Sequence, residues 1–233
     1  MRFAYGLTLV LAAALIVPPT VGLDAQDANR KVAGGGILIA GWQGKADDSK
    51  ENTGSTIQDG KLAMEGQAIK VTTGPSAVYW NPKNVAQGNY TVKATFTEPE
   101  YMNINSHPHP YGVFIGGNDM GTASQSLLYC AAYGNGRFIV RGFGPAPFQM
   151  NGRGAEAPSV NKAAGPKQPV KQEIAMTVKG DQVTCDINGQ TVATYTKADL
   201  VAAGKLKSTD GVYGLRSGHN TDVSVTGLTM TKN

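Results

Sequence analysis

Short runs of alternating apolar and polar residues follow one another along most of the chain. Such alternation, with a period of two, is typical of strands that bury one face. The clearest run lies at 90–97, and turn-forming residues separate the runs. Strands are therefore predicted at 37–39, 56–58, 61–64, 68–72, 77–80, 90–97, 173–179, 182–187, 190–195, 212–216 and 222–230, with three more inside the block 111–144.

Turn-forming and helix-capping residues lie between the predicted strands. Asp59-Gly60 predicts a two-residue hairpin between the runs on either side of it. One short helix is predicted, with Thr196 as N-cap, Asp199 in its first turn and Gly204 closing it. Many short strands and one minor helix favour a single all-β domain over residues 37–233. The predicted architecture is a two-sheet antiparallel jelly-roll β-sandwich, and a β-barrel is the alternative.

The segment from Pro145 to Pro169 contains five prolines and has no periodicity. A segment of this length without secondary structure in a compact domain is usually functional or disordered. Because it follows the block 111–144 and has no core-forming pattern, we expect it to lie over one edge of the concave sheet. A disordered excursion is the alternative.

Within the block 111–144, the Gly-Asn-Gly sequence can turn in two registers. A two-residue loop pairs Tyr133 with Phe138, whereas a three-residue loop with a left-handed Gly136 pairs Tyr133 with Arg137. A slip of one residue exchanges the two faces of a strand. We prefer the three-residue loop because it avoids burying an unpaired arginine. It places Leu128, Cys130, Ala132, Phe138 and Val140 on an apolar face and Tyr129, Tyr133, Arg137 and Arg141 on the other.

Residues 1–25 have the features of a signal peptide. Arg2 is followed by an apolar run at 7–17 and by an imperfect cleavage site at 23–25. The apolar run is shorter than the roughly 20 residues of a transmembrane helix, although a retained anchor is the alternative. Residues 26–36 are polar and glycine-rich, so a flexible lead-in is predicted there. We expect an exported protein, periplasmic or extracellular, with no membrane span in the mature chain.

Cys130 and Cys185 are the two cysteines of the chain. Export would place them in an oxidising compartment, where they could form one disulfide or remain two buried thiols. Both lie at inward positions of alternating runs. Because a bond needs Cα atoms within about 7 Å and packed sheets lie about 10 Å apart, bonding is easiest between neighbouring strands or at an edge.

The net charge is +4, but the 21 lysine and arginine residues are scattered along the chain. No basic cluster indicates a nucleic-acid partner, so we interpret the charge as solvated surface.

Several short motifs follow one another along the chain: Gly41-Trp42, Asp59-Gly60-Lys61-Leu62, Gly88-Asn89-Tyr90-Thr91-Val92, the run 178–190 and Asp210-Gly211-Val212-Tyr213-Gly214-Leu215-Arg216. Their order resembles the concanavalin-A-like lectin/glucanase superfamily. Within it, the sequence is most similar to exported bacterial domains grouped with 3-keto-disaccharide hydrolases. The resemblance covers roughly residues 41–230 and implies a jelly roll that handles sugars on its concave sheet. It departs from that family at 116–119, and the Glu-x-Asp-x-x-Glu strand of retaining glucanases is absent.

Glycoside hydrolysis normally needs two carboxylates about 5 to 10 Å apart. Glu98 and Glu100 are on one face of an extended segment, but Pro99 between them favours an exposed pair at a strand end. Asp119 and Asp186 are weaker candidates, better interpreted as turn or surface carboxylates. The catalytic residues therefore stay unknown.

His107 and His109 are weak candidates for metal binding. Two histidines at i and i+2 of an extended chain project to one side, and imidazole suits zinc or copper. A zinc site normally needs three or four protein ligands, which this pair alone does not supply. We therefore predict no metal and no cofactor, with a structural cation left open, and interpret the pair as part of a stiff proline-rich loop.

Carbohydrate is the predicted partner. We expect a saccharide to bind on the concave sheet, with hydrolysis of a 3-keto-disaccharide or related modified sugar as the alternative. Tyrosine rings can stack on sugars, and arginines donate several hydrogen bonds to hydroxyls or carbonyls. The predicted ligand-binding residues are Tyr129, Tyr133, Arg137 and Arg141, with Tyr111 and Asp119 as further candidates.

Overall fold

The computed structural model describes residue 1, residues 27–49 and residues 52–233. Residues 2–25 of the predicted signal peptide lie outside this part. Among the described residues, no helix is long and apolar enough to cross a membrane. Those residues form two curled, largely antiparallel β-sheets and one short α-helix, which is the predicted jelly-roll sandwich.

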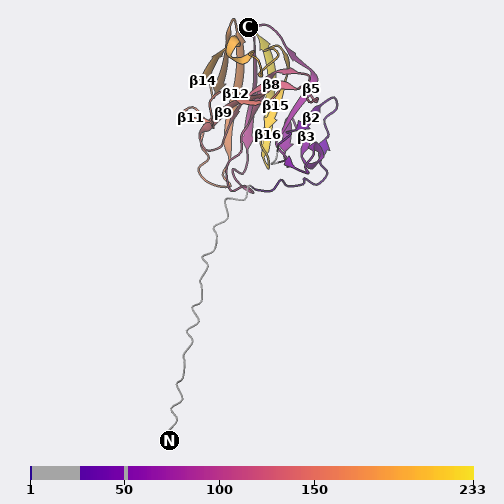
Figure 1. Ribbon diagram of the computed structural model, residues 1–233, viewed down its shortest axis with the longest axis vertical. Helices are drawn as coiled ribbons and strands as arrows, with labels where there is room; N and C mark the ends of the chain where they lie inside the picture. Colours follow the sequence, from indigo (N-terminus) through magenta and orange to yellow (C-terminus); the bar gives the residue numbers. More distant parts are fainter. Residues whose placement is uncertain (2–26, 50–51) are drawn as a thin grey trace.

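The first sheet has the strand order β1-β3-β4-β16-β6-β12-β13-β14. Figure 1 views the two sheets face on, one in front of the other, with β14 and β9 at the left and β3 and β2 at the right. The strands of the first sheet are β1 (Gly36–Ile37), β3 (Lys61–Glu65), β4 (Ala68–Thr72), β16 (Asp222–Lys232), β6 (Tyr90–Glu98), β12 (Val170–Lys179), β13 (Gln182–Ile187) and β14 (Gln190–Thr196).

The second sheet has the order β10-β9-β8-β7-β15-β5-β2, and the short β11 also pairs with β9. It carries the central block of the sequence as three adjacent strands. Its strands are β10 (Pro147–Gln149), β9 (Arg137–Phe143), β8 (Ser126–Ala132), β7 (Tyr111–Asn118), β15 (Gly211–Ser217), β5 (Ala77–Ala86), β2 (Gln43–Ala46) and β11 (Ala155–Glu156).

The core lies between the sheets, where inward residues of each strand meet. Strand alternation produces this core: β12, for example, buries every second residue from Val170 to Val178. The predicted apolar face of the central block, with Leu128, Cys130 and Val140, belongs to it.

The three-residue Gly-Asn-Gly turn is confirmed. Ala132 pairs with Phe138, and the amide of Tyr133 donates to the carbonyl of Arg137 at 2.8 Å. Gly136 has a φ of +88°, the left-handed conformation that this turn requires. The side chains of β8 and β9 are therefore divided between the two faces of the sheet as predicted.

The short helix is also confirmed. The α1 helix (Lys197–Leu200) has Thr196 as its N-cap, and the side chains of Thr196 and Asp199 form a capping box.

The predicted hairpin at Asp59-Gly60 is wrong. Residues Ile57–Asp59 form a 3₁₀ turn, η2, and Gly60 has an extended φ of −106°. Thr56 and Asp59 make a second capping box, which satisfies the first amides of the turn and so competes with strand pairing. Two other boundaries differ, since β5 continues through Pro82 and β2 occupies residues for which no strand was predicted.

The segment 145–169 is part of the second sheet rather than a cover over it. Its strands β10 and β11 both pair with β9 and so protect that edge. The prediction that it lacks core residues is wrong, because Val160 is 2% exposed and belongs to the inter-sheet core.

The predicted lead-in contacts the domain from Asp27 onward. Arg30 donates from Nη1 to Asp222 at 2.8 Å and from Nε to the carbonyl of Thr73 at 2.8 Å. The amide of Val32 donates to the carbonyl of Asp59. These bonds join the start of the domain to η2, to the residue after β4 and to the first residue of β16.

Cys130 of β8 and Cys185 of β13 form a disulfide in the structure, with Cα atoms 5.9 Å apart. The expectation that a bond would favour neighbouring strands or an edge is wrong, because β8 and β13 belong to different sheets. Both cysteines are buried in the core, so the disulfide crosses from one sheet to the other. The curled sheets approach more closely here than the typical spacing.

Candidate functional site: a pocket on the second sheet

The face of the second sheet that points away from the first sheet, the outer face, carries a second apolar cluster. Strand alternation explains it, because Val113 and Ile115 of β7 face the core whereas Phe114 faces outward. Many apolar side chains on this face are buried, so they are not accessible to a ligand. The buried members are Val78, Trp80, Phe114, Leu127, Tyr129, Ala131 and Ile139.

Arg216 lies in the middle of the outer face and is 5% exposed. Its Nη1 and Nη2 donate to the two carboxylate oxygens of Asp47 at 2.6 and 2.5 Å. The guanidinium also lies over the rings of Tyr129 and Phe143, 5.1 and 5.5 Å from their centroids. Burial disfavours the charge, but the Asp47 carboxylate and the Tyr129 side chain together outweigh burial and raise the pKa of Arg216, which stays charged.

A pocket of about 280 Å³ opens beside this ion pair. Tyr133 and Arg141 are half-buried on its wall, and the ring of Tyr129 is 2% exposed. The expectation that Tyr129 offers a free ring for stacking is therefore wrong, since Arg216 and Phe143 cover it. The lining includes Asp47, Asp48, His107, His109, Tyr129, Tyr133, Ile139, Arg141, Phe143, Arg216 and His219.

Three of the predicted ligand-binding residues do not line this pocket. Tyr111 faces the inter-sheet core and is fully buried, because it shares the inward face of β7 with Val113. Asp119 lies in the turn after β7 and pairs with Lys207. Arg137 donates from Nη2 to the carbonyl of Gly154 at 3.2 Å, beside the segment that contains β11. The structure brings together Tyr129, Tyr133 and Arg141.

The carboxylate pair suggested by the sequence is also separated from the pocket. Glu98 is 8% exposed in the interior, so the expectation of an exposed pair with Glu100 is wrong for Glu98. Glu100 accepts a hydrogen bond from Asn103, and Asp186 accepts one from Thr184. Neither of these two lines the pocket.

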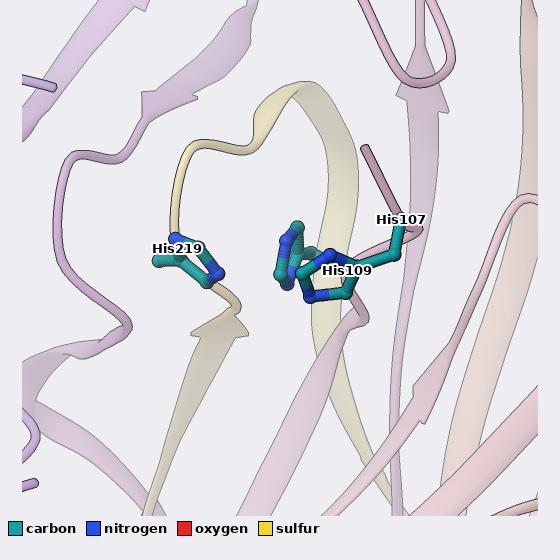
Figure 2. Close-up of side chains that lie close together, drawn as sticks. All are labelled: His107, His109 and His219. Carbon is teal, nitrogen blue, oxygen red and sulfur yellow. The ribbon is translucent and has the colours of Figure 1, made fainter. Parts of the chain in front are cut away.

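All three histidines of the chain meet at one wall of the pocket (Figure 2). His107 and His109 come from the loop before β7, and His219 comes from the turn between β15 and β16. The ring of His109 lies between the other two, with centroid distances of 3.8 Å to His219 and 4.4 Å to His107. One ligand nitrogen from each histidine lies within 4.8 Å of the others.

Three residues that line the pocket were not predicted from the sequence: Asp47, Arg216 and His219. Alternation offered a signal for Arg216, because an inward Leu215 places Arg216 on the outer face. Asp47 follows β2 in a stretch for which no strand was predicted, and nothing in the local sequence indicates a partner 169 residues away.

No protein-family model matches the sequence, and no curated protein matches it. The fold is similar to that of a Bacillus subtilis protein of unknown function with a galectin-like fold, at 9% identity and a TM-score of 0.52. That match covers 89% of this chain and 94% of the other. The protein therefore has a galectin-like, concanavalin-A-like sandwich fold.

Two further solved structures are less similar. The carbohydrate-binding module CBM66 from Bacillus subtilis has 10% identity and a TM-score of 0.40, over 84% of this chain and 99% of that one. The exoplasmic/lumenal domain of VIP36, in a Ca²⁺- and mannose-bound form, has 11% identity and a TM-score of 0.47, over 84% of each chain.

Proposed function

We propose that the protein binds a saccharide in the pocket on the outer face of the second sheet, and that this face is the concave face of the sandwich. The observation that carries the proposal is the meeting of Tyr133, Arg141 and Arg216 on the walls of one pocket. A tyrosine ring can pack against the apolar face of a sugar, and its hydroxyl remains available for a hydrogen bond. Guanidinium groups donate hydrogen bonds in a fixed geometry to hydroxyl or carbonyl oxygens.

The ion pair with Asp47 prepares the pocket for a ligand. Because Arg216 is held by two hydrogen bonds and two rings, little of its side-chain freedom remains to be lost on binding. The volume of about 280 Å³ is close to the lower limit of small-molecule sites, about 300 Å³. The pocket therefore suits one or two sugar units, or the end of a longer chain.

Calorimetric titration of a glycan panel tests the proposal. We expect Tyr133→Ala to weaken binding of the best ligand about tenfold or more, because the stacking surface is lost; tenfold corresponds to about 1.4 kcal/mol. Tyr133→Phe keeps the ring and should bind more tightly than Tyr133→Ala.

Arg141→Ala should also weaken binding, whereas the matched control Arg153→Ala should not, because Arg153 is exposed outside the pocket. The proposal fails if no glycan binds, or if Tyr133→Ala and Arg141→Ala bind the ligand as wild type does.

Hydrolysis of a 3-keto-disaccharide or related modified sugar is the second candidate. Two carboxylates, Asp47 and Asp48, line the pocket, and glycoside hydrolysis normally uses two. We prefer binding because Asp47 is already engaged by both guanidinium nitrogens of Arg216. A product-release assay with 3-keto-glucosides and ordinary glycans separates the candidates, since turnover requires catalysis.

We also propose that the protein is exported to the periplasm or the extracellular space. The signal-like residues 1–25 and the buried disulfide support this, because disulfides persist in oxidising compartments. Cell fractionation with N-terminal sequencing of the mature chain is the test, and an uncleaved protein in the cytoplasm would contradict it.

A further inference from the structure

The histidine cluster is held in place by bonds between two loops that are distant in the sequence. The amide of Gly218 donates to the carbonyl of Pro110 at 2.7 Å, and Asn105 Nδ2 donates to the carbonyl of Asn220 at 3.1 Å. A Cβ atom at Gly218 would lie 2.9 Å from the Cβ of His109, which is too close. Glycine at 218 therefore allows the turn with His219 to approach the loop with His109.

His109 has a buried nitrogen that lacks a partner. Its Nε2 is shielded from solvent and makes no hydrogen bond. A buried polar atom without a partner is unfavourable, so such an atom in a native protein calls for an explanation such as a bound ion. Because the imidazoles of His107 and His219 lie beside His109, a cation is the ligand that best fits the site.

The surroundings of His107 suit metal binding. Asp27 Oδ2 lies 3.7 Å from His107 Nδ1 and also accepts hydrogen bonds from the amide and hydroxyl of Ser106. A carboxylate behind one ring nitrogen orients the other toward a metal.

We propose that His107, His109 and His219 bind one divalent transition-metal ion of the zinc, copper or nickel group. Imidazole suits these ions, whereas Mg²⁺ and Ca²⁺ prefer oxygen ligands. Zinc–nitrogen bonds of about 2.0–2.1 Å place the donors of a tetrahedral site about 3.3 Å apart. The nitrogens lie within 4.8 Å of one another, so a contraction of about 1.5 Å or less completes the site.

Three protein nitrogens leave at least one coordination position for another ligand. This arrangement is typical of zinc sites that hold an exchangeable water, whereas structural zinc sites are closed by four protein ligands. All three histidines line the same pocket as Tyr133 and Arg141, so a ligand in the pocket could reach a metal bound there. A water molecule or an oxygen of a pocket ligand would occupy the remaining coordination position.

Calorimetric titration of untagged, chelator-treated protein with ZnCl₂ tests the site, with MgCl₂ as the comparison. We expect one Zn²⁺ per chain and no binding of Mg²⁺. His107→Ala is the first variant, because this side chain is 46% exposed and its removal leaves the core intact. It should weaken Zn²⁺ binding about 100-fold or more, beyond the 10- to 100-fold loss typical of second-shell changes.

Three further variants sharpen the result. His219→Ala should abolish Zn²⁺ binding, and Asp27→Asn should weaken it about tenfold through the orientation of His107. The control Arg153→Ala, at an exposed position outside the pocket, should leave Zn²⁺ binding unchanged. Circular dichroism of each metal-free variant establishes that it is folded. The proposal is overturned if the wild type binds no Zn²⁺, or if folded His107→Ala and His219→Ala bind it as tightly as wild type. No sugar is needed, so this result is independent of saccharide binding.

Discussion

Glu98, the last residue of β6, is a buried carboxyl group away from the pocket. Its Oε2 has no hydrogen-bond partner, and a Cβ atom on the neighbouring Gly134 would lie 3.0 Å from it. Burial raises the pKa of Glu98 from an ordinary 4.5 to about 7. The neutral acid is therefore favoured in the folded protein at mildly acidic pH.

This raised pKa makes stability depend on pH. In the unfolded chain Glu98 loses its proton near pH 4.5, whereas in the folded protein it keeps the proton to about pH 7. The folded state thus binds more protons between these values, and its stability falls as the pH rises from 4.5 to 7. We expect Glu98→Gln to match wild type near pH 4 and to be more stable by about 3 kcal/mol at pH 8.

Urea unfolding of both proteins at several pH values measures this difference. Glu65→Gln is the matched control, because Glu65 is exposed on β3, and it should change stability little at any pH. A constant difference between Glu98→Gln and wild type from pH 4 to 8 would show that Glu98 titrates normally.

At the scale of elements, the segment 145–169 completes one edge of the second sheet. Its two short strands pair with β9, and the amide of Ala157 donates to the carbonyl of Gly136. Val160 then enters the inter-sheet core. This arrangement implies that the segment stabilises the fold besides bordering the pocket.

We expect Val160→Ala to lower the free energy of unfolding by about 2 kcal/mol, because it removes a buried side chain and leaves a cavity. Pro158→Ala, at an exposed position two residues earlier, is the control and should have a small effect. Chemical denaturation measures both. Equal stability of Val160→Ala and wild type would mean that the segment only covers the sheet.

Strands and turns could be predicted from the sequence where a single local pattern determines the backbone structure. The Gly-Asn-Gly register followed from keeping Arg137 and Arg141 out of the core, and the structure has that register. At Asp59-Gly60 two local patterns compete, since Thr56 and Asp59 also have the spacing of a capping box. The turn signal alone therefore predicted the wrong element.

The candidate site was predictable only in part. Tyr133 and Arg141 followed from the register, whereas Arg216 and His219 reach the pocket through the pairing of β15 with β7. His109 and His219 are 110 positions apart, and no local pattern indicates their contact. Tyr111 was assigned to the site on residue type alone, although its alternation with Val113 places it in the core.

At the scale of the whole molecule, the disulfide joins the two sheets through the core between them. Cys130 and Cys185 are 55 positions apart, and the chain between them contains the segment 145–169 as well as β9 and β12. A crosslink that closes a loop of this length stabilises a protein by about 4 kcal/mol in the chain-entropy description, mainly by restricting the unfolded chain.

We expect the double variant Cys130→Ala with Cys185→Ala to be less stable by about 2 to 4 kcal/mol. Its denaturant m-value should rise, because an unfolded chain without the crosslink exposes more surface. The matched control Val140→Ala creates a cavity in the same core and should lower stability without changing m. Peptide mapping without reductant detects the bond directly. Free thiols in the purified protein, or an unchanged m-value in the double variant, would mean that packing rather than a covalent link holds the sheets together here.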